Sequence, residues 1–162
     1  MSALIVWTSG TPDGAERAAR VVRDLPTPAR EGVHDAALVC WPRGSATPTT
    51  RMLPDLASDE ALGEGFWGVL FGLIFYSPLL GAAVVSSGEA FSGSIAGFGI
   101  ADTFVNRARD TVTPGTSALF VLGSDALVDH VRAAPGADQV ASLLVTRLTA
   151  SQEGALRQVF VG

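Results

Sequence analysis

Residues 65–88, GFWGVLFGLIFYSPLLGAAVVSSG, contain no Asp, Glu, Lys, Arg or His. A helix needs about 20 mainly apolar residues to cross the hydrocarbon core of a bilayer, and residues 66–85 are long enough. Small residues also recur at helical spacing, since Gly68 and Gly72 lie four positions apart. Such spacing lets two helix backbones approach closely. The run therefore predicts helices that are buried against lipid or protein.

The rest of the chain has the composition of an ordinary globular domain. Its 162 residues carry a net charge of −5, and 48% of them are hydrophobic, which is enough to form one domain with a real core. All 11 basic residues are scattered arginines, a distribution that argues against a nucleic-acid partner. The N-terminal sequence MSALIVWTSG lacks the basic start of a signal peptide, so we expect a cytoplasmic protein.

Hydrophobic periodicity and turn residues predict an alternation of strands and helices. Strands are expected over residues 3–7, 33–41, 47–53, 116–122 and 140–146, and helices over residues 13–25, 102–111 and 151–161 and between Asp125 and Pro135. Pro48 marks residues 47–53 as an edge strand that forms a hairpin with the strand before it. Thr11 is expected to cap the first helix, and residues 149–152 have the spacing of a capping box.

The order of these elements is β-α-β-β, an apolar helical insert, one helix, and then β-α-β-α. This order matches an α+β fold of the ferredoxin-like kind, in which helices cover one face of an open sheet. We expect a single domain over residues 1–162, with residues 60–98 forming an inserted glycine-rich apolar helical hairpin. Ser77 and Pro78 divide this hairpin into helices over residues 60–76 and 79–97.

The apolar run and the segments that follow it contain several distinctive motifs. They are FWGVLFGLI at residues 66–74, PLLGAA at 78–83, Gly99 and Ile100 leading to Phe104, and PGTSALFVL at 114–122. Together these motifs resemble the DUF1269 family of bacterial proteins. The resemblance implies a glycine-rich hairpin within a ferredoxin-like module and the label of a predicted membrane protein, and it brings no known reaction. Ser86, Ser87 and Glu89 depart from the small apolar residues that the family tends to have there.

The hairpin could be buried in three ways. A single membrane span would place strands of one sheet on opposite sides of the bilayer and prevent their pairing. A hairpin that returns to the same side has a first arm, residues 66–76, of only about 16 Å, and Glu89 in the second arm would be costly in lipid. Burial against the same hairpin of other copies is therefore preferred. Insertion into or attachment to a membrane is one alternative, and burial in the chain's own core is the other.

Catalytic and metal-binding chemistry is sparse in this sequence. His34 and His130 have no Cys or Glu at ligand spacing, and the lone Cys40 cannot form an internal disulfide. The loop at residues 9–14 could cradle a phosphate at a helix N-terminus, but it lacks the lysine of a P-loop, and a capped turn is preferred. We therefore predict no catalytic residue, no metal and no cofactor.

The predicted function follows from the hairpin. We expect a non-enzymatic structural or scaffold protein that forms a homo-oligomer, with the inner face of the cell membrane as a second place of attachment. The alternatives are an integral membrane protein of the DUF1269 type and a ferredoxin-like module that binds a small ligand. The expected oligomer or membrane interface consists of aromatic, leucine and glycine residues: Phe66, Trp67, Gly68, Phe71, Gly72, Phe75, Leu79, Gly81, Gly88, Gly93 and Gly97.

Overall fold

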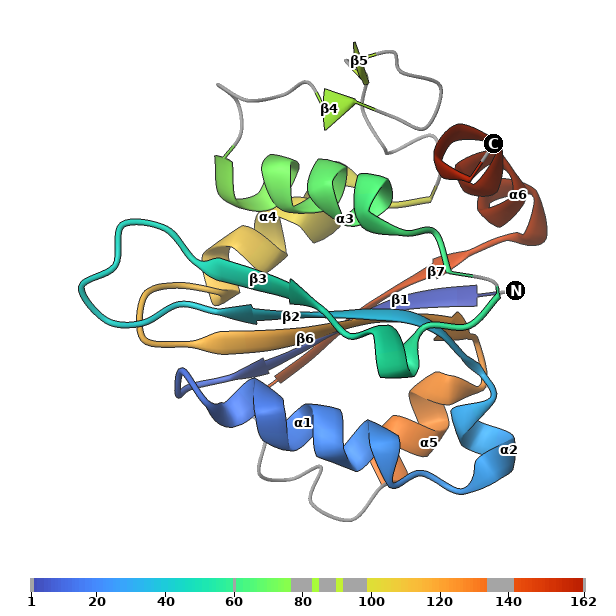
Figure 1. Cartoon of the computed structure of the whole chain (residues 1–162), viewed down its shortest axis with the longest axis horizontal. Helices are drawn as coiled ribbons and strands as arrows, with labels where there is room; N and C mark the ends of the chain where they lie inside the picture. The colour runs from blue at the N-terminus through green and yellow to red at the C-terminus, as the bar shows by residue number, and fades with distance from the viewer. Residues whose placement is uncertain are drawn as a thin grey trace.

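The computed structural model describes residues 2–59, 61–76, 83, 84, 90, 91, 99–133 and 142–161. The elements are β1 (Ser2–Ser9), α1 (Gly14–Arg23), α2 (Thr27–Arg30), β2 (Val33–Cys40), β3 (Thr49–Met52), the 3-10 turn η1 (Pro54–Leu56), α3 (Glu64–Phe71), the π-helical turn η2 (Gly72–Tyr76), β4 (Ala83–Val84), β5 (Ala90–Phe91), α4 (Asp102–Thr111), β6 (Ser117–Ser124), α5 (Leu127–Ala133), β7 (Ser142–Leu148) and α6 (Ala150–Phe160). This succession of strands and helices confirms a mixed fold of helices and strands (Figure 1).

A five-stranded antiparallel sheet forms the centre of the molecule, in the order β3-β2-β6-β1-β7. β1 pairs with β6 on one side and with β7 on the other, and it is buried along its whole length. β2 and β3 form the expected hairpin, which places β3 at one edge of the sheet. The edge position of residues 47–53 is thus confirmed, with the strand itself limited to Thr49–Met52.

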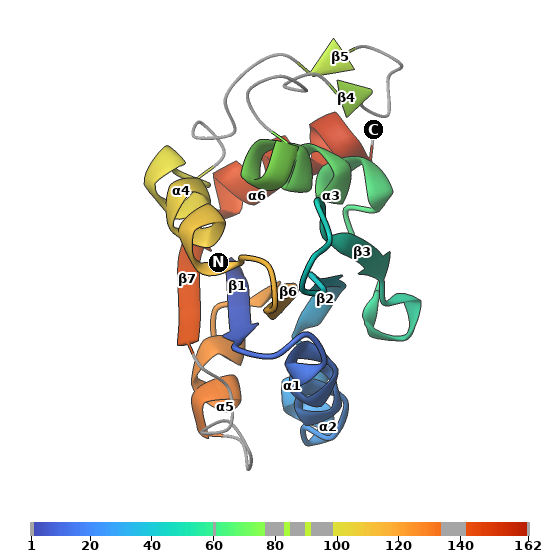
Figure 2. The same ribbon diagram turned by 90° about the vertical axis from the view of Figure 1, so that its left-hand side faces the viewer.

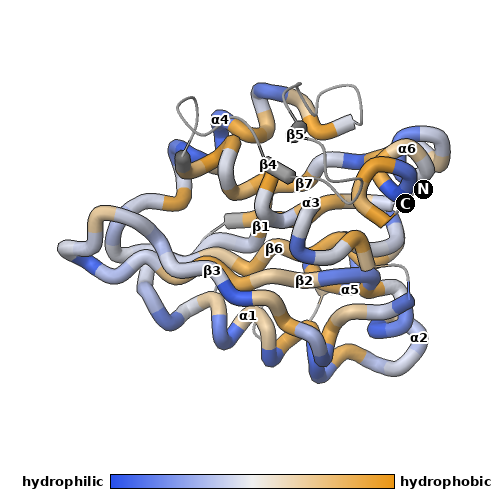
Figure 3. Tube along the Cα trace, turned by 45° about the horizontal axis from the view of Figure 1, so that its top comes forward, coloured by the Kyte–Doolittle hydropathy of each residue, from blue (hydrophilic) through white to orange (hydrophobic). Residues whose placement is uncertain are grey.

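Helices α1, α2 and α5 cover one face of the sheet (Figure 2). α1 is amphipathic: Ala15, Ala18 and Ala19 are fully buried against the sheet, while Arg17 and Arg20 are exposed on the opposite side. Figure 3 shows this as an alternation of hydrophilic and hydrophobic colour along α1. Small alanine side chains let the helix lie close to the strands, and the arginines keep its outer face in water.

Helices α3, α4 and α6 cover the opposite face (Figure 2). Phe66 and Trp67 of α3 are both 1% exposed, and Phe71 packs edge-on against Phe120 of β6 with ring centroids 5.0 Å apart. Phe66 also meets Phe160 of α6 at 5.6 Å. The first half of the uncharged run therefore covers the chain's own sheet through a cluster of aromatic rings.

Two expectations about the architecture were wrong. The sheet is covered by helices on both faces rather than on one, because α3, α4 and α6 bury a second apolar core. The second helix expected over residues 79–97 is contradicted where the structure describes this region, since β4 and β5 pair as antiparallel strands. The physical reason lies in the sequence AVVSSGEAF, because β-branched valines followed by Ser-Ser-Gly favour strand and turn over helix.

The helix boundaries test the predicted caps. At α6 the capping box is confirmed: Gln152 N donates to Thr149 Oγ1 at 3.1 Å, and Thr149 N donates to Gln152 Oε1 at 2.8 Å. At α1 the N-cap is Asp13 rather than Thr11. Within the described residues, no helix is both long and apolar enough to cross a membrane.

Candidate functional site

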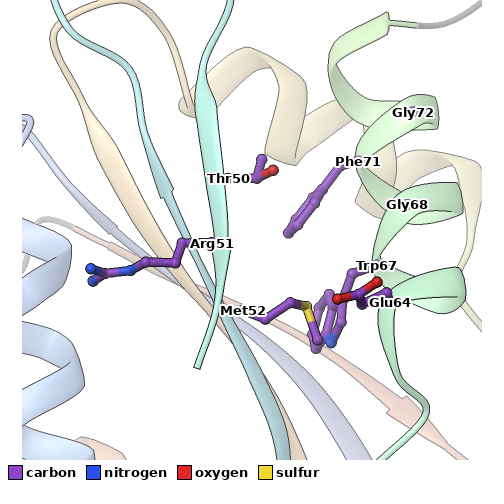
Figure 4. Close-up of a pocket in the computed structure, with 8 residues that line it drawn as sticks. All are labelled: Thr50, Arg51, Met52, Glu64, Trp67, Gly68, Phe71 and Gly72. Atoms are coloured by element: carbon purple, nitrogen blue, oxygen red, sulfur yellow. The ribbon is translucent and has the colours of Figure 1, made fainter. Parts of the chain in front are cut away.

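A groove between the edge strand β3 and α3 is the best candidate for a site that contacts another molecule. We call it the β3–α3 groove; it has a volume of about 290 Å³ and is lined by Thr50, Arg51, Met52, Glu64, Trp67, Gly68, Phe71 and Gly72. Figure 4 shows Phe71 reaching from α3 toward β3, with Trp67 beside Met52. Arg51 points away from the groove, and its Nη2 donates to Glu16 Oε1 at 2.5 Å. The groove is thus apolar and aromatic inside, with the Glu64 carboxylate at its rim.

The strand side of the groove is an open but limited sheet edge. Leu53 N donates to Ala36 O at 3.1 Å, which extends the β2–β3 register by one residue beyond the pair of Ala37 with Met52. Because hydrogen-bonding directions alternate along an antiparallel strand, the N–H groups of Thr50 and Met52 point away from β2. Pro48 and Pro54 flank the strand and have no N–H group. The edge can therefore pair over only a very short stretch, a common protection against strand addition.

The helix side of the groove is unusually bare. Gly68 is exposed, and in the part of the chain that the structure describes a Cβ added there would meet no heavy atom within 4 Å. Gly72 lies one turn further along and also lines the groove. Phe66 points into the core, and the buried rings of Trp67 and Phe71 line the groove. At Gly68 the outer surface of α3 is accordingly helix backbone that no side chain of the described residues covers.

Charges lie at the two ends of α3. Glu64 is exposed in the first turn, where a carboxylate is favoured by the helix dipole. Arg109 of α4 lies at the other end, where its Nε donates to Ile74 O at 2.8 Å and its Nη2 donates to Leu73 O. The guanidinium thereby satisfies carbonyl groups at the C-terminal end of the helical segment. The bare helix face lies between an acidic and a basic end.

Asp35 of β2 attaches the start of α3 to the sheet. This aspartate on β2 is fully buried, and its Oδ2 accepts hydrogen bonds from Trp67 Nε1 at 2.9 Å and Gly63 N at 3.2 Å. A register shift between Val33 and Asp35 in the pairing with β6 marks a β-bulge. The extra residue explains why Val33 packs on the α1 side of the sheet while Asp35 reaches α3.

The expected interface residues fall into four groups. Phe66, Trp67 and Phe71 are buried within the chain, while Gly68 and Gly72 line the β3–α3 groove. Phe75 is partly buried and packs edge-on against Trp41 at 5.9 Å. The remaining five, Leu79, Gly81, Gly88, Gly93 and Gly97, lie outside the described residues. The structure thus places Gly68 and Gly72 in one groove with Trp67 and Phe71.

The other chemical candidates have local structural roles. In the loop at residues 9–14, Ser117 Oγ donates to Thr11 O at 2.6 Å and accepts from Ala15 N at 2.9 Å, so a first-turn amide is already used. Cys40 Sγ donates to Pro12 O at 3.0 Å. Among the described residues, no three His, Cys, Asp or Glu side chains are placed to hold a metal.

His34 belongs to a small polar cluster at the end of the sheet. Its Nδ1 lies 3.6 Å from Glu153 Oε1, and Ser2 Oγ donates to Glu153 Oε2 at 2.6 Å. His130, in contrast, is exposed on α5. His34 and His130 thus lie on opposite faces of the sheet.

Sequence reasoning missed Asp35, Thr50 and Met52. An acid within an apolar strand is an available signal, because a buried carboxylate requires hydrogen-bond donors. The bulge that turns Asp35 toward α3 has no comparable signal in the sequence. Thr50 and Met52 enter the site only because β3 lies beside α3, which is a property of the assembled fold.

Comparison with known proteins identifies the family. The family model described as "Protein of unknown function (DUF1269)" matches residues 61–161, from the segment before α3 to the end of α6. Searches of curated proteins and of solved structures each returned no match. The matched part contains β6 and β7, but β1 lies between these strands in the sheet, so the fold also requires residues before the match. The chain belongs to the DUF1269 family.

Proposed function

We propose that this protein is a non-enzymatic module that self-associates through the outer face of α3 beside the β3–α3 groove. The observation that carries the proposal is the open surface at Gly68, which is exposed helix backbone next to an aromatic hollow. A glycine surface on one helix lets a second helix approach closely, so that dispersion contacts form along the backbone. Solvation of an amphipathic helix would instead call for polar side chains at this position.

A second copy of this chain is the occupant that the charges favour. If two α3 helices cross antiparallel at Gly68, Glu64 of one copy lies opposite Gly72 of the other. That places the carboxylate near the end of the partner helix where Arg109 binds the carbonyls of Leu73 and Ile74. The contact is repeated by the twofold symmetry that most homodimers have. Acidic and basic helix ends would therefore meet twice.

Extension of the sheet through β3 is the less favoured route to the same assembly. The flanking prolines limit pairing to the region of Thr50 and Met52, and a symmetric pair centred there would place Arg51 against Arg51 of the second copy. Like charges directly opposite each other destabilise a strand pair. We expect Thr50→Pro, which removes one of the edge N–H groups, to leave the association unchanged.

We also propose that the central part of the fold has a ferredoxin-like topology. The path β1-α1-β2-β6-α5-β7 with the sheet order β2-β6-β1-β7 supports a ferredoxin-like topology to which β3 adds an edge strand. The helices on the second face, and α3 above all, are then additions to that module. Such an addition gives the protein an interaction surface without altering the central strands.

Light scattering after size-exclusion chromatography without detergent tests the function. We expect the wild-type protein to form a multimer and Gly68→Leu to have a lower mass, because the leucine side chain prevents close approach of the helices. Gly154→Leu is the matched control, since Gly154 is an exposed glycine on α6 with open space around it. It should retain the wild-type mass.

Four results would contradict the proposal. A monomeric wild-type protein at all concentrations would exclude self-association, and an equal mass for the two glycine variants would exclude the α3 face. Recovery of the protein only in the membrane fraction would identify lipid as the partner. Native mass spectrometry could also find a stoichiometric small molecule on the wild-type protein that is absent from Trp67→Ala. That result would favour ligand binding in the groove instead.

A further inference from the structure

We propose that Asp35 is a positioning residue for the β3–α3 groove: its carboxylate fixes Trp67 and the start of α3, and thereby sets the surface on which a second copy docks. Asp35 is fully buried and would not touch that copy. The inference rests on the proposed self-association. Asp35 would act on the β3–α3 groove indirectly, through the indole ring of Trp67 to which it is hydrogen-bonded.

The carboxylate joins three segments of the chain. Asp35 Oδ1 accepts from Ala36 N at 2.9 Å on its own strand, and Oδ2 accepts from Gly63 N at 3.2 Å and Trp67 Nε1 at 2.9 Å. Burial of a carboxylate is costly unless donors of this kind surround it. Hydrogen bonds to a charged acceptor are also stronger than those between neutral groups. One side chain of β2 therefore holds both the approach to α3 and its first full turn.

The carboxylate lies at the start of a helix that has no side-chain cap. Gly63 is the N-cap residue of α3, has φ of 85° and has no side chain that could accept from the first amides. A negative charge at a helix N-terminus is favoured by the orientation of the peptide dipoles. Asp35 supplies this charge from β2 and accepts from the N–H of Gly63, so its carboxylate attaches the start of α3 to the sheet.

The position of Trp67 is transmitted to the groove through ring contacts. The indole stacks on Phe71 with centroids 5.7 Å apart and an interplanar angle of 25°, and both rings line the groove. Phe71 in turn packs at 84° against Phe120 of the sheet. Gly68 follows Trp67 directly in α3. A change in the indole therefore moves the floor of the groove and the glycine face together.

Association constants measured by sedimentation on Asp35→Asn, Trp67→Phe and the double variant test the inference. Asp35→Asn keeps the shape of the side chain but removes its charge, and Trp67→Phe keeps an aromatic ring but removes the N–H donor. Each should weaken association by about tenfold while leaving the far-ultraviolet circular dichroism unchanged. The double variant should weaken association by less than the two single effects added together, because both substitutions disrupt the same Asp35–Trp67 hydrogen bond. Asp55→Asn, which changes an exposed acid, serves as the control.

A spectroscopic readout separates positioning from a general loss of stability. In Asp35→Asn the indole N–H resonance of Trp67 should shift, and those of Trp7 and Trp41 should not. Association within twofold of the wild type for a folded Asp35→Asn, or for Trp67→Phe if Asp35→Asn does not fold, would overturn the inference. So would single effects that add in the double variant.

Failure of the proposed function would have a different signature. In that case the wild-type protein would itself be monomeric. The coupling between Asp35 and Trp67 would then still be measured from the free energies of unfolding of the same variants. Additive free energies in that measurement would overturn the positioning of Trp67 as well.

Discussion

The two faces of the sheet are covered by helices of opposite design. α1 turns buried alanines toward the strands and presents Arg17 and Arg20 to water. α3 turns large aromatic rings toward the strands and presents Gly68 outward. The inward side of each helix packs against the sheet, with small side chains in α1 and large ones in α3. The outward sides differ in chemistry, because α1 presents charged side chains and α3 presents a glycine. Water solvates the arginine side chains on the outer face of α1. A glycine on the outer face of a helix instead exposes backbone, which another helix can approach closely.

This difference changes the meaning of the uncharged run. Hydropathy alone marks residues 65–88 as one long apolar segment. In the structure its first half is an ordinary core-forming helix, because Phe66, Trp67 and Ile74 are buried in the chain's own second core. The unusual property of α3 is therefore its outer face and not its hydrophobicity. Substitutions on the two covered faces should therefore differ in their effects on stability.

Truncation of the aromatic cluster should be the most destabilising change. Trp67→Ala is expected to lower the free energy of unfolding by about 3–5 kcal/mol, because it opens a cavity and removes the indole donor to Asp35. Val22→Ala on the α1 face should cost only about 2 kcal/mol. Urea unfolding measures both values. Equal losses would show that the aromatic cluster holds the sheet no more firmly than the α1 layer does.

Added volume should have opposite effects on the two helices. Ala18→Leu should destabilise by about 1–3 kcal/mol, because Ala18 is fully buried between α1 and the sheet. Gly68→Ala should stabilise the monomer by about 1 kcal/mol, since alanine is a better helix former and its Cβ meets open space. Thermal unfolding of both variants at low protein concentration makes the comparison. Destabilisation by Gly68→Ala would mean that the outer face of α3 is already packed.

The exposed ion pair between Arg23 of α1 and Asp55 of η1 should contribute least to the free energy of unfolding. Arg23 Nε donates to Asp55 Oδ2 at 2.6 Å, and this hydrogen bond holds the pKa of Asp55 below its ordinary value of 3.8. The stabilisation is thus complete above pH 3.8 and is lost as the pH falls through the lower pKa of the folded state. Both side chains are partly exposed, so Asp55→Asn should change the free energy of unfolding by less than about 1 kcal/mol at neutral pH. A larger loss would show that η1 depends on this pair.

The α1 face could be predicted from the sequence more fully than the α3 face. Alanines and arginines recur at helical spacing in α1, a pattern that indicates the buried side of a helix, and the capping box at Thr149 to Gln152 marked the start of α6. In α3 the whole segment is apolar or glycine, so no polar stripe indicated its orientation. The choice between own core, other copies and lipid depended on whether the second face of the sheet was free.

The candidate site was predictable only in part for a related reason. Gly68 and Gly72 stood out by their spacing, and both line the groove. Met52 lines the groove from β3 and Asp35 binds Trp67 from β2, through a pairing register and a β-bulge that depend on the folded sheet. A single residue inserted at a bulge reverses the side to which the following side chains point. Spacing along the chain does not reveal such a reversal.

Disulfide formation between copies tests the central claim most directly. In a Cys40→Ser background, the protein would carry either Gly68→Cys or Gly154→Cys and be exposed to a mild oxidant. Two cysteines form a bond only when their Cα atoms come within about 7 Å, so the reaction reports close approach of the same helix in two copies. We predict a covalent dimer for Gly68→Cys and none above background for Gly154→Cys. Equal reaction of the two variants, or dimer formation only through Gly154→Cys, would contradict the account.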